Sequence, residues 1–304
     1  MTWEGVIKDF MRYLKLERGL SENTLMAYRR DIEKLAVWGV ENDIRPNDVQ
    51  LETLRKFLSS KSKLSPRSQA RLITSIKTLF RFLVYDDAIK EDPTSLLEAP
   101  RLGRKLPDYL SDDEVTDMIN AIDRSTLEGE RNSAILEVLY ACGLRVSELI
   151  NLRLSDYFPK DGILRVFGKG DKERLVPIHP YAVEALNHYI DQVRVHVDVK
   201  HGEEDIVFLS KRGKRMGRST VFTMIQGLAE KAGIKKNIGP HTFRHSFATA
   251  LVNNGADLRV VQQLLGHESI TTTEIYLHLE EKKLRAAINS HPWSNKKSTG
   301  DSRF

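Results

Sequence analysis

Apolar residues recur at helical spacing through the first hundred residues of the chain. The first such set, which predicts one helix, comprises Trp3, Val6, Ile7, Phe10 and Leu14. Ser21 is a suitable N-cap for a second helix that runs toward Trp38, and Gly39 fits its C-terminal cap. A third helix follows Pro46, and a fourth starts near Pro66, since proline is tolerated in a first turn. The pattern therefore predicts a helical bundle.

A basic stretch that contains Pro93, Pro100 and Pro107 follows this bundle and is typical of an extended interdomain linker. After it, the sequence Ser111-Asp112-Asp113-Glu114 resembles a capping box that starts a new helical domain. A chain of 304 residues is long enough for two cores. We therefore expect a helical N-terminal domain at 1–91, a linker at 92–110, a second domain at 111–292 and a polar, disordered tail at 293–304.

The second domain shows helical patterning with one β interruption. Residues 162–167 and 174–178 are strand-like, and the glycine-rich turn between them contains Lys169, so this unit predicts a β-hairpin. Helices are expected near 180–196 and 219–232, from His241 onward, and over Leu258–Leu265. The fold class that follows is mainly α, with a small β-hairpin or sheet.

Composition excludes several classes of protein. Hydrophobic residues make up 40% of the chain and charged residues 29%, which argues against disorder. The N-terminus lacks the pattern of a secretory signal, and no apolar run approaches the roughly 20 residues of a membrane span. The single cysteine, Cys142, is insufficient for an internal disulfide or a cysteine metal cluster. We therefore expect a cytoplasmic protein that does not associate with a membrane.

The distribution of charge points to an anionic partner more clearly than the formal net charge of +5 does. Two basic stretches, 53–85 and 211–218, contain no acidic residue. A solvated basic face explains either stretch alone, whereas two of them favour phosphate contact. The candidate phosphate contacts are Arg55, Lys56, Lys63, Arg67, Arg71 and Lys77 in the first stretch, and Lys211, Arg212, Lys214 and Arg215 in the second.

Six further residues carry side chains suited to phosphate chemistry. They are Arg145, Lys169, His241, Arg244, His267 and Tyr276. Phosphodiester transfer spreads negative charge over non-bridging oxygens, which paired guanidinium groups bind well. A lysine can protonate the leaving oxygen, a histidine can act as a base near neutral pH, and an assisted phenol can act as a nucleophile. The set is sufficient for phosphoryl transfer without a metal.

Taken singly, each of the six also has a structural explanation. Arg145 fits a helix-end ion pair with Glu148, and Lys169 fits a solvated turn. His241 and Arg244, three residues apart, fit one face of an amphipathic helix. His267 fits a histidine bonded to a backbone carbonyl, and Tyr276 fits a half-buried aromatic residue. Spacing alone does not bring these positions into one pocket.

Four motifs resemble those of the tyrosine recombinase, or phage integrase, family, in the family's order and at its separations. Residues 141–149, ACGLRVSEL, resemble its first arginine motif, and residues 241–249, HTFRHSFAT, resemble its His-x-x-Arg box. The hairpin turn 168–174, GKGDKER, matches the segment that bears the family's lysine. Residues 264–276, LLGHESITTTEIY, resemble its second histidine and nucleophile box. The segments 18–31 and 255–262 are further similar to Xer-type recombinases, so the resemblance covers about residues 5–292.

The resemblance implies a role for each matching residue. Tyr276 would be the nucleophile that forms a 3′-phosphotyrosyl intermediate, and Arg145 and Arg244 would hold the non-bridging oxygens of the phosphate. Lys169 would protonate the leaving 5′ oxygen. The supporting roles would belong to His241 as the base, His267 as a hydrogen-bond donor to the phosphate, and Glu148 as a residue that orients the basic side chains. The family uses neither a metal ion nor another cofactor, and its reaction needs no ATP.

The resemblance also implies an architecture and a set of partners. Two domains, a SAM-like core-binding domain and a catalytic domain, would form a C-shaped clamp around double-stranded DNA. A homo-tetramer, or a hetero-tetramer with a paralogous recombinase, would assemble on a dif-like site to resolve chromosome or plasmid dimers, under the control of a cell-division DNA translocase. The helix after Tyr276, with Leu279, Leu284 and Ile288, is the candidate element exchanged between protomers. The alternative is that it packs on its own domain.

Three other functions remain open at this point. An integrase of a mobile element would share both core domains. A type IB topoisomerase would share the catalytic chemistry, although the Xer-like N-terminal segment argues against it. A DNA-binding protein without activity would be expected to lack Tyr276 or an arginine, and both are present.

Overall fold

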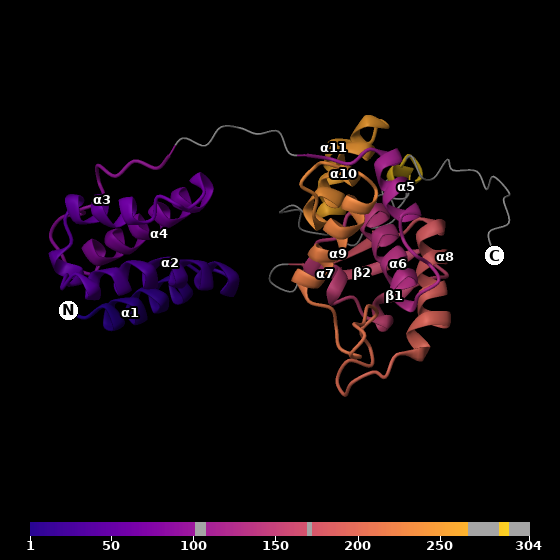
Figure 1. Ribbon diagram of the computed structural model, residues 1–304, viewed down its shortest axis with the longest axis horizontal. Helices are drawn as coiled ribbons and strands as arrows, with labels where there is room; N and C mark the ends of the chain where they lie inside the picture. Colours follow the sequence, from indigo (N-terminus) through magenta and orange to yellow (C-terminus); the bar gives the residue numbers. More distant parts are fainter. Residues whose placement is uncertain (101–107, 169–171, 267–285, 292–304) are drawn as a thin grey trace, which may run out of the picture. The chain divides into compact units, whose positions relative to one another are not determined.

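The computed structural model describes residues 1–100, 108–168, 172–266 and 286–291. The chain divides into two compact units, Met1–Lys105 and Leu106–Phe304, each with its own hydrophobic core (Figure 1). Both units are mainly helical, and the second also contains a small antiparallel sheet, which confirms the predicted fold class. None of the described helices combines the length and apolar character that crossing a bilayer requires.

The first unit is a bundle of the four predicted helices. These are α1 (Trp3–Leu16), α2 (Glu22–Glu41), α3 (Leu51–Ser60) and α4 (Pro66–Tyr85), with a short 3-10 helix at Pro46–Asp48. The apolar faces of α1, α2 and α4 pack together, and Phe10, Leu35 and Phe80 are fully buried between them. Helix α4 starts at Pro66 as predicted, and Ser65 caps it by accepting a hydrogen bond from the backbone N–H of Ser68.

The prediction that Gly39 caps the second helix is wrong. Helix α2 continues through Gly39 to Glu41, and the cap is Asn42. The glycine is required by packing, since a Cβ at this position would lie 2.7 Å from Nε1 of Trp3. The indole of Trp3 packs against the helix there, and its Nε1 donates a hydrogen bond to the carbonyl of Ile44 at 2.9 Å. A contact across 36 positions of sequence therefore explains a residue that resembles a local stop signal.

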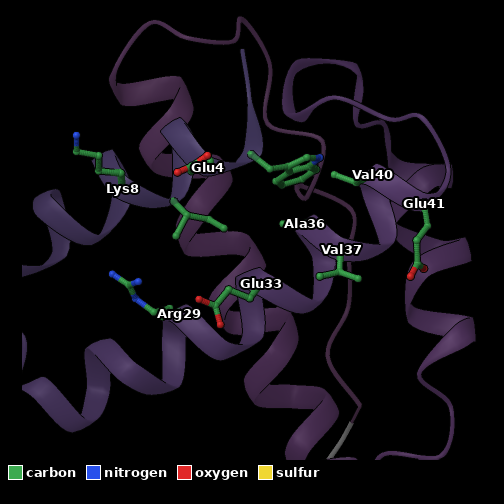
Figure 2. Close-up of a pocket in the computed structure, with 10 residues that line it drawn as sticks. Glu4, Lys8, Arg29, Glu33, Ala36, Val37, Val40 and Glu41 are labelled. Atoms are coloured by element: carbon green, nitrogen blue, oxygen red, sulfur yellow. The ribbon is translucent and has the colours of Figure 1, made fainter.

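A cavity of about 650 Å³ lies between α1 and α2 in this unit. Figure 2 shows its walls, which include the apolar side chains of Ala36, Val37 and Val40 and the charged side chains of Arg29 and Glu33. None of the predicted site residues lines it.

The second unit begins with the predicted capping box. The Ser111 hydroxyl accepts from the Glu114 N–H, and the Glu114 carboxylate accepts from the Ser111 N–H. The following helices are α5 (Asp112–Asn120), α6 (Leu127–Cys142) and α7 (Val146–Ile150), and then, after the sheet, α8 (Pro180–His188), α9 (Arg218–Lys231), α10 (Pro240–Asn253) and α11 (Leu258–Leu265). Helix α6 is buried in the centre and packs against α8 and α10 (Figure 1).

The sheet has three strands in the order β1 (Tyr157–Phe158), β2 (Ile163–Phe167) and β3 (Glu173–Pro177), all antiparallel. Strands β2 and β3 form the predicted hairpin, with Val166 opposite Arg174. Strand β1 has only two residues, which is too short for a recognisable alternation of apolar and polar positions in the sequence. The segment predicted as one helix near 180–196 changes geometry, because α8 passes into a π-helical turn at Tyr189–Val193 and a 3-10 turn at Arg194–His196.

The described end of the chain packs on its own unit. Ala287 and Ile288 join a small core with Phe247 and Leu251 of α10 and Leu264 of α11. This packing on its own domain is the alternative given above for Ile288, and exchange of this element between protomers stays a prediction. The other two residues of that prediction, Leu279 and Leu284, lie outside the described residues.

Candidate active site

The end of α6 and the start of α7 place the first arginine of the predicted site. Helix α6 stops at Gly143, whose φ of 58° allows the left-handed cap, and Arg145 then precedes α7. Glu148, in the first turn of α7, accepts the backbone N–H of Arg145 at 2.7 Å and its guanidinium Nη1 at 2.8 Å. The helix-end ion pair between Arg145 and Glu148, which the sequence offered as a structural explanation of Arg145, is present. It fixes the direction of the Arg145 guanidinium.

Helix α10 places the second arginine of the predicted site. Arg244 is buried, and it donates from Nη1 to the carbonyl of Gly143 at 2.8 Å and from Nη2 to the carbonyl of Leu265. Burial lowers its pKa to about 10, with a further contribution from the positive charge of Arg145. Arg244 therefore stays protonated at neutral pH. His241, one helical turn earlier, is exposed at the N-terminal end of α10.

A third arginine, which the sequence analysis missed, joins these two. Arg174 on β3 donates from Nη1 and Nη2 to the two oxygens of Glu148, at 2.7 and 2.8 Å. The Glu148 side chain is only 1% exposed. Burial by itself raises the pKa of Glu148, but hydrogen bonds and charge from Arg174 and hydrogen bonds from Arg145 outweigh it, and the pKa lies below its ordinary value. Glu148 is therefore an ionised carboxylate at neutral pH.

All three guanidinium groups meet the C-terminal end of α11. Arg174 Nε donates to the carbonyl of Leu264 at 3.0 Å, Arg244 donates to that of Leu265, and Arg145 Nη2 donates to that of Gly266 at 3.1 Å. The last carbonyls of a helix have no partner within it and carry partial negative charge, so cationic donors are well placed there. Strand β3, helix α10 and the connection between α6 and α7 are thereby joined at the end of α11.

The electrostatic result is a cluster with an excess of positive charge. Three arginines and one carboxylate give a net charge of +2 at neutral pH. Arg145 keeps 31% of its side chain exposed, whereas Arg174 keeps 14%. Such a cluster suits a small anion with several oxygens, such as a phosphate. No group of three or more His, Cys, Asp or Glu suitable for a metal ion occurs within the described parts of the chain.

Three predicted site residues, Lys169, His267 and Tyr276, lie outside the described residues. The described residues that directly precede Lys169 and His267 lie beside the cluster. A Cβ built on Gly168 would be 4.0 Å from Nη1 of Arg145, and the carbonyl of Gly266 accepts from the same guanidinium. Arg145 is therefore close to the residue that precedes the predicted lysine and to the residue that precedes the predicted second histidine.

The acid-free basic stretches are partly paired with acids from elsewhere in the fold. Arg55 pairs with Glu52, and Arg71 pairs with the buried Asp31.

In the second stretch, Lys211 pairs with Glu128 and Arg215 with Glu203. A stretch that has no acidic residues in its sequence can therefore still lie next to acidic residues in the folded chain. Of the predicted contacts, Lys56, Lys63, Arg67, Arg212 and Lys214 are exposed and show no ion pair among the described residues, while Lys77 is half-buried.

Comparison with known proteins identifies the family. Residues 108–283 match the model for the phage integrase family, and residues 7–86 match the model for the phage integrase N-terminal SAM-like domain. The chain belongs to the phage integrase family. Tyrosine recombinase XerD of Staphylococcus aureus is 40% identical to this recombinase over 293 residues, which cover 95% of this chain and 99% of that protein. Tyrosine recombinase XerD of Oceanobacillus iheyensis is 42% identical over 300 residues, with the same coverage.

Solved structures agree with this assignment. A crystal structure of XerA recombinase is 34% identical, with a TM-score of 0.50, and the match covers 95% of this chain and 99% of that one. A XerH site-specific recombinase bound to palindromic difH substrate, in a post-cleavage complex, shares the fold at 22% identity and a TM-score of 0.69, over 95% and 85% of the two chains. This recombinase is therefore of the Xer type, a site-specific tyrosine recombinase that cleaves and rejoins DNA through a covalent tyrosine intermediate.

Proposed function

We propose that Arg145 and Arg244 bind the scissile phosphate of DNA and that Tyr276 is the nucleophile that attacks it. The observation that carries the proposal is the convergence of Arg145 and Arg244 on consecutive carbonyls at the end of α11. That helix leads directly into His267 and, nine residues later, Tyr276. The guanidinium groups would stabilise the charge that develops on the non-bridging oxygens.

The proposed reaction is a pair of transesterifications. The Tyr276 oxygen attacks phosphorus, its proton passes to His241, and the bond from phosphorus to the 5′ oxygen breaks. Lys169 gives a proton to that oxygen, which leaves as a free 5′ hydroxyl, while His267 donates a hydrogen bond to the phosphate. A new 5′ hydroxyl reverses these steps. Because the phosphotyrosyl bond retains the energy of the broken bond, we expect the cycle to need no ATP, metal ion or other cofactor.

The two units would divide the work of binding DNA. We assign core-DNA binding to residues 1–91, the linker to 92–110, catalysis to 111–292 and a polar tail to 293–304. The exposed Lys56, Lys63 and Arg67 of the first unit and Arg212 and Lys214 of the second would contact phosphates of the duplex. Arg55, Arg71, Lys211 and Arg215 would contribute less, because their charges are partly neutralised by carboxylates.

The biological role that we infer is resolution of chromosome or plasmid dimers at a dif-like site in the cytoplasm. The relatives named XerD over nearly the whole chain support this role over that of a mobile-element integrase. Strand exchange between two duplexes requires four active sites, so the recombinase would act as a homo-tetramer or with a paralogous partner. A DNA translocase of the division machinery is the proposed activator.

The proposal is tested with a duplex that carries the host's candidate dif site and a nick close to the scissile phosphate. After cleavage the short fragment diffuses away, so the covalent protein–DNA adduct accumulates and is visible as a band on a denaturing gel. We expect the adduct with the wild-type protein in the presence of a metal chelator and no ATP. Adduct formation by Tyr276→Phe, or none by the wild-type protein on any dif-like sequence, would refute the proposal.

A further inference from the structure

Arg174 occupies a position that the chemistry proposed above does not explain. It lies on β3, where strand alternation places it on the same inward face as the buried Val176. All three of its guanidinium nitrogens donate hydrogen bonds, two to Glu148 and one to the carbonyl of Leu264. These bonds use three of its five N–H groups, and only 14% of the side chain is exposed, so Arg174 mainly serves contacts within the protein.

We propose that Arg174 is a positioning residue for the arginine pair that holds the phosphate. Its charge neutralises the buried carboxylate of Glu148, so that the charge of Arg145 remains available to DNA. This inference rests on the proposed function, because it takes Arg145 and Arg244 as the phosphate-binding pair.

The geometry at Glu148 supports the electrostatic part of this role. Each carboxylate oxygen accepts two hydrogen bonds, one from the Arg174 fork and one from the backbone or side chain of Arg145. Without Arg174, a buried carboxylate with a single cationic partner would remain. An uncompensated buried charge is costly, so Glu148 would draw the Arg145 guanidinium fully into an ion pair. The net charge of the cluster would fall from +2 to +1.

The geometry at α11 supports a second part of this role, which is to hold the end of that helix in place. Gly266 has a φ of 63°, and a Cβ there would lie 3.2 Å from both Cδ and Nη1 of Arg174. The guanidinium therefore packs closely against the helix end whose carbonyls also bind Arg145 and Arg244. Arg174 connects three elements in this way: the hairpin strand β3, helix α7 through Glu148, and the C-terminus of α11.

The test compares Arg174→Gln with a matched control in the same sheet. Arg165 on β2 also binds a buried carboxylate, that of Asp156, at 2.7 Å, but lies outside the cluster. On the nicked substrate at saturating DNA, we expect Arg174→Gln to slow adduct formation by about tenfold to a hundredfold, because the charge and placement of a transition-state donor are disturbed. Affinity for DNA should change little. Arg165→Gln should cleave at the wild-type rate.

A double variant separates positioning from simple structural support. If the uncompensated charge of Glu148 causes the loss, adding Glu148→Gln to Arg174→Gln should recover about tenfold in rate. Arg174→Lys, which keeps the charge but loses the fork, should cleave at a rate between those of the wild type and Arg174→Gln. Melting temperatures identify any variant that fails to fold. If Arg174→Gln fails to fold, the cleavage rate of Arg174→Lys is compared with that of the wild type instead.

Three results would overturn the inference. They are cleavage by Arg174→Gln within about twofold of the wild type, a double variant no faster than the single one, or a lysine variant no faster than the glutamine variant. Failure of the proposed function is seen separately, because it would appear as normal cleavage by Tyr276→Phe or by Arg145→Lys in the same assay.

Discussion

His291 should make the stability of the second unit depend on pH. Its side chain is 2% exposed and lies between two aromatic rings, with centroids 5.7 Å from Phe247 and 4.7 Å from Tyr140. Burial lowers the pKa of His291 from 6.5 to about 4, with a smaller contribution from His179. The imidazole is therefore neutral in the folded protein at neutral pH.

The sign and size of the effect follow from linkage. The unfolded chain binds a proton at this residue near pH 6.5 and the folded chain only near pH 4, so the free energy of unfolding falls as the pH falls through this window. Since a tenfold difference in proton affinity is worth about 1.4 kcal/mol, His291 should remove about 2 kcal/mol between roughly pH 7.5 and pH 5. For a unit of about 200 residues this corresponds to about 4–8 °C in melting temperature.

The assay measures melting temperatures of the wild type and His291→Phe at both pH values. Phenylalanine keeps the aromatic packing without a proton site, so the variant should lose about 2 kcal/mol less on acidification. Because His179 also has a pKa lowered by burial, the difference between the two proteins is the relevant quantity. His196→Gln, at an exposed position, serves as the control and should behave like the wild type. Equal acid sensitivity of the wild type and His291→Phe would refute the reasoning.

Three further predictions concern the site and the first unit. Arg145→Lys and Arg244→Lys should each reduce the cleavage rate about a hundredfold, because an ammonium group lacks the bidentate fork; near-normal rates for both would place the phosphate elsewhere. Lys169→Ala should cleave normal DNA slowly but a 5′-bridging phosphorothiolate well, since sulfur leaves without a proton; equal loss on both would remove its role as an acid. Asp31→Asn should lower the free energy of unfolding by about 2 kcal/mol in urea, because a buried carboxylate that accepts three side-chain hydrogen bonds loses its charge; an unchanged midpoint would contradict this.

Local signals in the sequence were sufficient for most of the helices and for the hairpin. The capping residues Ser65 and Ser111 act within three residues of themselves, so their effect can be predicted from the chain alone. The bounds predicted for α11 from apolar spacing, Leu258–Leu265, agree with the structure. These features succeed because their physical causes are near neighbours in sequence.

The errors have causes that lie far away in sequence. Gly39 resembles a helix stop, but Trp3 is the reason for it. Lys211 belongs to an acid-free run, yet Glu128 is its partner in space. The spacing of residues along the sequence does not predict that Gly39 contacts Trp3 or that Lys211 contacts Glu128. These contacts depend on the packing of whole helices.

The candidate site was predictable in part. Motifs identified Arg145, Arg244 and Glu148 through resemblance, and the structure brings these residues together. Arg174 was quoted within the hairpin motif but given no role, since its value depends on a carboxylate 26 positions away in sequence and on the end of α11. Strand alternation, which turns it to the same face as Val176, was the one signal that could have found it.

The most direct test of the account is to locate the covalent bond to DNA. The adduct formed on the nicked dif-like substrate is digested with nuclease and protease, and the peptide that retains a nucleotide is sequenced by mass spectrometry. We predict a single modified residue, Tyr276, attached to a 3′-phosphate, and no modified peptide from Tyr276→Phe. A nucleotide on any other residue, or attachment through a 5′-phosphate, would contradict the proposed mechanism.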